Sequence, residues 1–508
     1  MTSPLDRRTF LQVSSALAAL VSQTAHSQVK TVPRASRVPV KNRKNFVGIQ
    51  VRGFAWVDEG VDQVLDNLQQ KGGVNTIFAY TFAYGEQRQR KGGSIPLPDH
   101  GISGTTDVTV GAFYDYDPKY FQNTILKDFR SSAYGKFNVI EDVAPKAKAR
   151  GMDFFAWDLN NPGAALVHQI PNYAEVTEVD AYGRRTTNAC FNHPDYRAFL
   201  SGKIESLLSG YPGEVDGIAW GSERTGPLEN MISGASIATC FCQFCQAKAR
   251  ELGISVERAQ EGYRELEQLF QAASQDQRPV DGYFTAFWRL LLKYPEILSW
   301  ETLWTDSLQG VEAELYGMAK GIAPQKPFGF HIMQSMTFSP FYRAEEDYTK
   351  RRDFADFLKP ATYNNAGGPR MAAYLDRLSG TIFHDATPND FLQLYYKIMN
   401  YQEAPYDQLA ATGLSADYVA KETKRALDGV AGEVKIYPGI DIDVPVLGGG
   451  PKPTDKRTKP EDVSRSLKAA FGAGADGVVL SREYAEMWLT NLSAAGDTLK
   501  EIFAQSKS

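Results

Sequence analysis

The sequence lacks the patterns of a membrane protein and of a histidine-based metal hydrolase. Beyond residue 44, no segment reaches the roughly 18 consecutive apolar residues that a membrane helix requires. The six histidines form neither His-x-His nor His-Glu-x-x-His, so a hydrolytic metal centre is not expected. The two longest stretches between predicted elements show neither internal repeats nor low complexity. We therefore expect a globular protein that has no organic cofactor.

Basic residues are in deficit over most of the chain. There are 55 Lys and Arg against 60 Asp and Glu, and the first 44 residues hold eight of the basic residues but one acidic residue. Residues 45–508 therefore carry 47 basic and 59 acidic side chains, a net charge of −12. An acidic body argues against a nucleic-acid partner and against adhesion to anionic lipid.

The N-terminal residues have the layout of an export signal. Arg7 and Arg8 precede Thr-Phe-Leu, the apolar run Val13–Val21 follows, and small residues surround position 27. The arginine pair resembles a twin-arginine signal, and the alternative is the basic start of a buried helix. We predict a signal peptide over 1–27, a basic linker over 28–44, and a periplasmic or secreted protein with no membrane contact after cleavage.

From residue 45 onward, short β-branched or aromatic runs alternate with helical stretches, which is typical of a parallel sheet. The expected strands are Phe46–Arg52, Asn75–Tyr80, Asp153–Trp157, Val215–Trp220, Phe328–Met333, Ala361–Asn364, Val434–Ile442 and Gly477–Ser481. Eight such strands predict an α/β fold, a (β/α)8 TIM barrel over 45–508. Insertions at 85–136 and, mainly helical, at 246–323 after the fourth strand are expected to shape a site.

Three of the four cysteines lie within six residues, at Cys240, Cys242 and Cys245, and the fourth is Cys190. Thiols at this spacing do not easily form relaxed disulfides with one another, whereas zinc accepts four thiolates in a tetrahedron. The pattern predicts a closed, structural zinc site. The alternatives are a Cys190 disulfide with two free thiols, or four buried thiols without metal.

The segment from Asp216 to Glu223, followed by the Cys-x-Cys-x-x-Cys pattern, resembles the family-42 β-galactosidases. The resemblance covers most of the barrel, and only the cysteine spacing is specific. It implies that Glu223, at the fourth strand, is the acid/base and that Cys190 lies in the segment supplying the fourth zinc ligand. The chain departs from the family in having Ser222 before this glutamate, and Asp441 and Asp443 where the family has a nucleophilic glutamate. β-Galactosidase activity is therefore not carried over.

Hydrolysis of a glycosidic bond requires two carboxyl groups beside it. Glu223 is the first candidate, because the two-residue period of a strand places it on the same face as three small residues before it. A structural alternative is a salt bridge with the adjacent Arg224. Asp441 or Asp443 is the expected partner, with Glu483 in reserve, and the alternative for the aspartates is a solvated acidic pair.

Further polar and aromatic side chains are expected at the carboxyl ends of the strands, where barrel enzymes place their sites. The candidate substrate-binding residues are Arg52, Trp157, Asp158, His331, Arg370, Arg482 and Glu483. Arg52, Arg370 and Arg482 would bind a carboxylate or sulfate if they converge. The alternative is that they pair with barrel carboxylates.

These patterns predict an exported glycosidase that acts on an oligosaccharide or glycoside. We expect an exo-acting, retaining enzyme with Glu223 as acid/base and a seventh-strand aspartate as nucleophile. The alternatives are a non-catalytic glycan-binding barrel, and a carbohydrate lyase or isomerase with Tyr437 or His331 as base.

Overall fold

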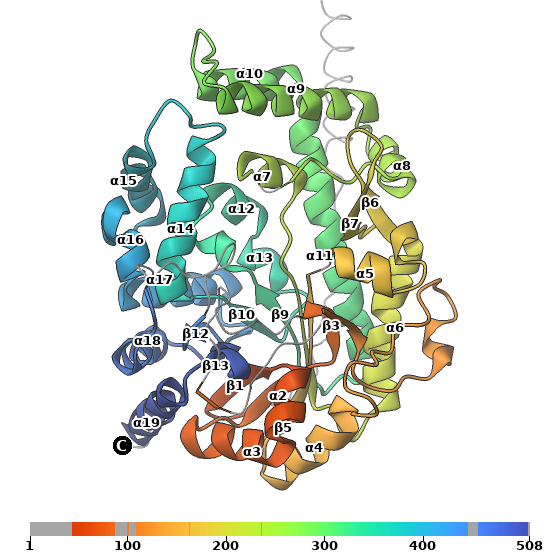
Figure 1. The fold of residues 1–508 in the computed structure, drawn as a ribbon, viewed down its shortest axis with the longest axis vertical. Helices are drawn as coiled ribbons and strands as arrows, with labels where there is room; N and C mark the ends of the chain where they lie inside the picture. Colours follow the sequence, from red (N-terminus) through yellow and green to blue (C-terminus); the bar gives the residue numbers. More distant parts are fainter. Residues whose placement is uncertain are drawn as a thin grey trace, which may run out of the picture. The chain divides into compact units, whose positions relative to one another are not determined.

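The structure is a computed structural model that describes residues 43–86, 99–100, 108–161, 163–234, 236–444 and 456–505 (Figure 1). The predicted signal peptide and nearly all of the predicted linker lie outside these ranges. Within them, none of the helices is long and apolar enough to cross a membrane.

The central sheet closes into a barrel. Its strand order is β11-β10-β9-β8-β5-β2-β1-β13-β12, with every pair parallel. The first and last strands of this order, β11 (Lys435–Ile436) and β12 (Gly439–Asp441), belong to one stretch of chain that Tyr437 and Pro438 interrupt. Because this stretch pairs with β10 on one side and β13 on the other, it closes the ring. The predicted (β/α)8 barrel is confirmed.

Except for β10, the remaining barrel strands lie close to their predicted positions. They are β1 (Phe46–Val51), β2 (Thr76–Tyr80), β5 (Asp153–Asn160), β8 (Gly217–Ser222), β9 (Phe328–Ile332), β10 (Phe357–Pro360) and β13 (Gly477–Glu483). Two small antiparallel hairpins lie outside the barrel: β3 (Phe82–Glu86) with β4 (Thr109–Ala112), and β6 (Thr177–Val179) with β7 (Arg185–Ala189).

The sixth strand was predicted four residues too late. It spans Phe357–Pro360, and Ala361 forms only a single bridge to Gly439 before the chain enters the next helix. Lys359 and Pro360 made this segment a poor strand candidate, since charged residues and proline are unfavourable inside a buried strand. Lys359 is nevertheless completely buried.

Helices connect the strands and cover the barrel. They are α2 (Gly53–Glu59), α3 (Val61–Asp66) with its extension η1 (Asn67–Lys71), η2 (Pro118–Phe121), α4 (Val139–Ala149), α5 (Ala164–Gln169), η3 (Tyr173–Val176), α6 (Pro194–Gly210), α7 (Pro227–Ile232), α8 (Gln243–Glu251), α9 (Val256–Ser274), α10 (Tyr283–Lys293), α11 (Glu296–Ile322), η4 (Gln334–Thr337), α12 (Pro340–Glu345), α13 (Tyr348–Arg351), α14 (Asn364–Ser379), α15 (Pro388–Met399), α16 (Tyr406–Thr412), α17 (Ala416–Val430), α18 (Pro460–Gly472), η5 (Tyr484–Glu486) and α19 (Leu489–Gln505). Asn138 caps the N-terminus of α4, and its side chain accepts hydrogen bonds from two backbone N–H groups of the first turn.

The insertion predicted at 246–323 is helical, as expected. It comprises most of α8 together with α9, α10 and α11, of which α9 and α10 lie at the top of Figure 1, away from the barrel. Figure 1 also shows that α11 runs from this layer down to the barrel.

The barrel interior is filled mainly by aromatic rings. Its members are Phe46, Phe78, Tyr80, Phe155, Trp157, Ala219, Phe357, Tyr437 and Val479. Tyr437 stacks on Phe46 with ring centroids 3.9 Å apart. This position makes Tyr437 a residue of the barrel core.

Candidate active site

Glu223 follows β8 directly, at the carboxyl end of the barrel strands, and its side chain is 26% exposed. The residues before it on the same face are small, as predicted, and Ala219 belongs to the interior cluster. At Gly221, an added Cβ would lie 2.7 Å from the Cβ of His331. Glycine at this position therefore allows β9 to bring His331 beside the glutamate.

His331 connects Glu223 to a buried lysine. Its Nε2 lies 3.4 Å from Oε1 of Glu223, and its Nδ1 lies 3.5 Å from Nζ of Lys359. Lys359 also donates to the hydroxyl of Tyr363. If the lysine donates to Nδ1, the Nε2 proton points at the glutamate. Burial, reinforced by Lys359, lowers the pKa of His331 to about 4, so the ring is neutral at pH 7.

The charges around Glu223 keep it ionised. Burial alone would raise its pKa, but the contact with His331 and the positive charges of Arg482 and Arg370 lower it to about 2. The pKa of Lys359 is lowered as well, in this case by burial, to about 7. For the lysine a lowered pKa favours the neutral form, whereas for the glutamate it favours the charged form. A resting acid would need a raised pKa, so this environment suits a carboxylate that acts as nucleophile or base.

Glu483, at the end of β13, has the contrasting environment. Its side chain is fully buried, Oε2 accepts a hydrogen bond from the backbone N–H of Arg52 at 3.4 Å, and Oε1 has no hydrogen-bond partner among the described residues. Burial, with Glu486 nearby, raises its pKa to about 8. Two carboxyl groups whose pKa values are driven apart are the usual arrangement of an acid and a nucleophile or base.

Asp441 is engaged in structural hydrogen bonds. Its Oδ1 accepts from the N–H of Asp443 at 3.0 Å, the N–H of Val444 at 2.8 Å and the hydroxyl of Thr458 at 2.9 Å. Its Oδ2 accepts from the N–H of Ala366, in the first turn of α14, at 2.9 Å. A carboxylate whose oxygens already accept four hydrogen bonds is poorly placed to attack a sugar.

We expect Asp441→Asn to destabilise the fold and to leave the chemistry intact. The new amide would place an N–H against either the N–H of Ala366 or the donors at Oδ1, which should cost about 1–3 kcal/mol of unfolding free energy. Denaturant unfolding measures the loss, and Asp497→Asn, at an exposed position of α19, is the matched control. A stable Asp441→Asn protein that has lost its turnover would instead show that Asp441 is catalytic.

Asp443 is held in a similar way. Arg457 donates from Nε to its Oδ1 at 3.0 Å and from Nη2 to its Oδ2, and the side chain is 3% exposed. Burial raises the pKa of Asp443 against the opposing effect of Arg457. The solvated acidic pair considered as an alternative does not form, because both aspartates are buried.

Asp158 points away from the strand ends where Glu223 and Glu483 lie. Its neighbour Trp157 points into the barrel, and alternate residues of a strand point to opposite sides. Its carboxylate contacts Nζ of Lys203, on α6, at 2.5 Å and accepts from the hydroxyl of Tyr84 at 2.8 Å. The structure therefore places Asp158 in a buried ion pair, and its substrate-binding role stays a prediction. Trp157 is buried in the barrel interior and meets the rings of Tyr80 and His331 edge to face.

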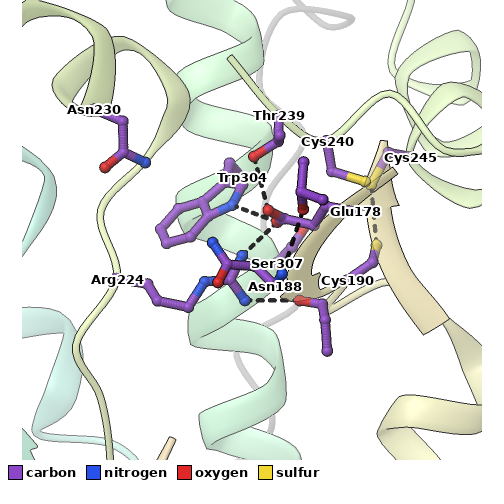
Figure 2. A network of polar contacts seen from close by, with 12 residues as sticks. Glu178, Asn188, Cys190, Arg224, Asn230, Thr239, Cys240, Cys245, Trp304 and Ser307 are labelled. Carbon is purple, nitrogen blue, oxygen red and sulfur yellow. Dashed lines mark hydrogen bonds and ion pairs between the residues drawn. The ribbon is translucent and has the colours of Figure 1, made fainter. Parts of the chain in front are cut away.

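Arg224 does not pair with Glu223. Its guanidinium contacts Glu178 at 2.5 Å, and Figure 2 shows the two side chains facing each other. It also donates to the carbonyl of Ala189 at 2.7 Å. Glu178 also accepts from Thr239 at 2.7 Å and from Trp304 at 3.3 Å. This buried network joins the residue after Glu223 to the hairpin that precedes Cys190.

The four cysteines come together as predicted and form no disulfide. Their sulfur atoms all lie within 4.8 Å of one another, and Sγ of Cys190 is 3.5 Å from those of Cys242 and Cys245. A tetrahedral zinc with Zn–S bonds of about 2.3 Å requires sulfur separations of about 3.8 Å, so the thiols fit this ion.

N–H groups surround these sulfurs, as they commonly do around metal-bound thiolates. Asn192 donates its backbone N–H to Cys190 and its side-chain amide to Cys245, both at 3.3 Å. Val179 donates to Cys240 at 3.5 Å. These N–H groups favour thiolate sulfur, in opposition to burial, which raises the pKa of Cys240.

Several residues of the candidate site were missed in the sequence. They are Tyr80, Gln334, Lys359, Tyr363 and Glu486. Lys359 could have been found as the only cation inside the Phe-Leu-Lys-Pro run, had that run been recognised as the sixth strand.

No model of a known protein family matches this sequence, and no curated protein sequence matches it. Solved structures do share its fold, and two β-galactosidases are among them. A β-galactosidase from the psychrophilic Marinomonas ef1 has a TM-score of 0.51 and 11% identity, over 91% of this chain and 60% of its own. A β-galactosidase from the Antarctic haloarchaeon Halorubrum lacusprofundi has a TM-score of 0.52 and 14% identity, over 90% of this chain and 58% of its own.

The chain thus spans about 60% of the length of these β-galactosidases. At 11–14% identity the likeness shows a shared fold. The resemblance to β-galactosidases seen in the sequence is confirmed at that level.

Proposed function

We propose that this chain is a glycoside hydrolase in which Glu223 is the ionised carboxylate and Glu483 supplies the proton. The observation that carries the proposal is the opposite electrostatic tuning of these two groups, at the carboxyl ends of the fourth and eighth barrel strands. The fold shared with two β-galactosidases supports a carbohydrate substrate.

In this mechanism, Glu483 gives its proton to the oxygen of the leaving group as the glycosidic bond breaks. Glu223, held anionic by Arg370 and Arg482, attacks the anomeric carbon or activates a water that does so. His331 is neutral, so its ring orients Glu223 and does not neutralise the negative charge of the carboxylate. The role of Glu223 thus differs from the acid/base role expected from the sequence, whereas its position at the fourth strand is the one expected.

The test is hydrolysis of aryl glycosides by the purified mature protein. Both anomers of several sugars should be included, and the configuration of the first product distinguishes retention from inversion. Release of the aryl group by wild type and its loss in Glu223→Gln supports the proposal. Sugar binding without hydrolysis of any substrate would instead favour the glycan-binding barrel.

Lys359 supports a second candidate, a lyase that cleaves uronate-containing glycans. Its pKa of about 7 leaves part of the amine neutral at neutral pH, and the amine contacts Tyr363. The amine would remove the proton beside the uronate carboxylate, and the C–O bond to the leaving sugar would break as its oxygen takes a proton from the Tyr363 hydroxyl. The products are a free sugar hydroxyl and an unsaturated uronate. Formation of that ultraviolet-absorbing product identifies this reaction and separates it from hydrolysis.

We also propose that the protein is exported by the twin-arginine route. Replacing Arg7 and Arg8 by lysine should leave the precursor in the cytoplasm, because this route depends on the arginine pair. Fractionation of cells that express the wild-type and variant precursors measures the effect. Normal export of the double-lysine variant would contradict the assignment.

A further inference from the structure

Glu223 is the first residue of the connection between β8 and α7, which consists of residues 223–226. The backbone N–H of Glu223 donates to the carbonyl of Asn160, the last residue of β5, at 3.3 Å. From Arg224 onward the chain leaves the barrel, so contacts outside the barrel determine the path of this connection. The place of the Glu223 side chain therefore depends on how the connection is held.

The end of the connection that enters α7 is fixed by a buried glutamate. Oε2 of Glu301, on α11, accepts from the N–H of Leu228 at 2.6 Å. A Cβ at Gly226 would lie 2.1 Å from Oε1 of Glu301, so glycine allows this close approach. The hydroxyl of Thr225 donates to the side chain of Asn230 at 2.7 Å. The far end of the connection is thus anchored.

Arg224 anchors the end beside Glu223. Its side chain is 6% exposed, and its Nη2 contacts Oε1 of Glu178, whose side chain is 1% exposed. Nη1 donates to the carbonyl of Ala189, and the guanidinium lies over the ring of Phe191, 4.6 Å from its centroid. Two neighbouring side chains thus point to different partners, the glutamate to the barrel end and the arginine to a buried pocket of fixed groups.

The partners of Arg224 are close to the cysteines in sequence. The carbonyl and the ring belong to the residues on the two sides of Cys190. Glu178 accepts a hydrogen bond from the hydroxyl of Thr239, directly before Cys240, as Figure 2 shows. The backbone N–H of the residue after Glu178 donates to Sγ of Cys240 at 3.5 Å. The guanidinium is therefore fixed by the same backbone that carries the cysteines.

A buried ion pair of this kind is a poor source of stability, because the cost of taking both charges out of water largely offsets their attraction. The ion pair of Arg224 does give direction, since the planar guanidinium contacts a carboxylate and a carbonyl from two nitrogens held in a rigid fork. An apolar side chain at position 224 would fill the same space without fixing the direction of the chain. The contacts of Arg224 thus suit a residue that positions its neighbour.

We propose that Arg224 is a positioning residue, whose contacts with Glu178 and with the segment around Cys190 hold the carboxylate of Glu223 beside His331. The inference rests on the proposed function, in which Glu223 is the reacting carboxylate. A displacement of about 1 Å in a reacting group can cost on the order of 10² in rate, so loss of this anchor should be visible in turnover.

Kinetics of the mature protein on aryl glycosides test the proposal. Arg224→Met should lower kcat by about 10- to 100-fold and change KM by less than about threefold, because the guanidinium does not contact the sugar. Arg224→Lys keeps the charge but loses the fork, so its kcat should lie between those of wild type and Arg224→Met. Glu178→Gln should also lower kcat, and adding it to Arg224→Met should cause little further loss, since both changes remove one interaction. Arg197→Met, on α6, is the matched control, because Arg197 also donates to the backbone of Phe191.

Two further measurements separate positioning from a loss of stability. The contact with His331 lowers the pKa of Glu223, so a displaced glutamate should lose its charge at a higher pH. The acid limb of kcat/KM should therefore move to higher pH in Arg224→Met and also in Arg224→Lys, which retains the positive charge. Hydrogen exchange, which needs no substrate, should be about tenfold faster in peptides that cover residues 223–226, while peptides of the barrel strands keep the wild-type rate.

Wild-type kcat and wild-type exchange in a correctly folded Arg224→Met protein overturn the proposal, as does a loss confined to KM. An effect of Arg224→Met that Glu178→Gln does not share also contradicts it, because the anchor would then lie elsewhere. The proposed function fails separately, through the absence of any hydrolysis by wild type or through full activity of Glu223→Gln. In that case the exchange rates still decide whether Arg224 holds the connection.

Discussion

Glu223→Gln should lower the turnover of glycosides by a factor on the order of 10³, a typical effect of removing an acid–base or nucleophilic carboxylate. Glutamine preserves the shape of the side chain but has no charge to stabilise a developing positive sugar. It also loses the charge that balances Arg370 and Arg482, so thermal unfolding of the variant must be measured alongside its kinetics. Glu314→Gln, on the surface of α11, provides the matched control.

The pH profile gives a second test of the same site. The pKa of Glu223 is lowered to about 2, so its ionised form persists through the whole weakly acidic range. The pKa of Glu483 is raised to about 8, so its proton is present below that pH and is lost above it. We therefore expect kcat/KM to fall above pH 8 and not between pH 7 and pH 5. In Glu483→Gln the alkaline limb should disappear, and substrates with good leaving groups should retain the most activity.

Two outcomes contradict this assignment. Wild-type rates in Glu223→Gln for every substrate would remove the fourth-strand glutamate from the mechanism. A decline in kcat/KM on the acid side, centred between pH 5 and 6, would mean that a different group must be ionised for activity.

Cys242→Ser should abolish metal binding and lower the melting temperature. The mature wild-type protein is expected to hold about one zinc ion, because four thiolates form a closed tetrahedral site. Such sites contribute on the order of 10 kcal/mol of folding free energy in isolated zinc domains, and a large barrel should lose part of that amount. Metal analysis and thermal unfolding of the variant measure both effects, and Cys190→Ser should behave in the same way.

Ala249→Ser is the control for these substitutions. It adds a hydroxyl at a buried position of α8, one helical turn after Cys245, without removing a ligand, so zinc should be retained. Wild-type protein that holds no metal and melts at the same temperature with and without a chelator would contradict the zinc hypothesis.

The sequence predicted the barrel because each strand is a short buried run with a helix after it, and these local signals agree along the chain. It also predicted the cysteine cluster, since three thiols within six residues restrict what the cluster can bind. Glu223 was predicted from a local pattern as well, because the three residues before it on the same face of β8 are all small.

The partners of Glu223 could not be predicted in the same way. Lys359 is a buried charge in a strand, and such a residue is tolerated there only because the folded barrel brings His331 and Tyr363 to it. Asp441 looked catalytic because strand-end aspartates often are. In the structure it accepts hydrogen bonds from residues 366 and 458, which are distant in sequence.

The pairing of β1, the first described strand of the chain, with β13, the last, has a consequence for the order of events during synthesis. β1 begins at Phe46 and its partner β13 begins at Gly477, so the ring cannot close on the ribosome until nearly the whole chain has emerged. Joining strands so far apart in sequence carries a large loop-closure entropy and makes this a late event in folding. Until then, the edges of β1 and β12 are open to pairing with other chains. An export route that accepts only folded cargo would thus hold back each molecule until its last strand is in place.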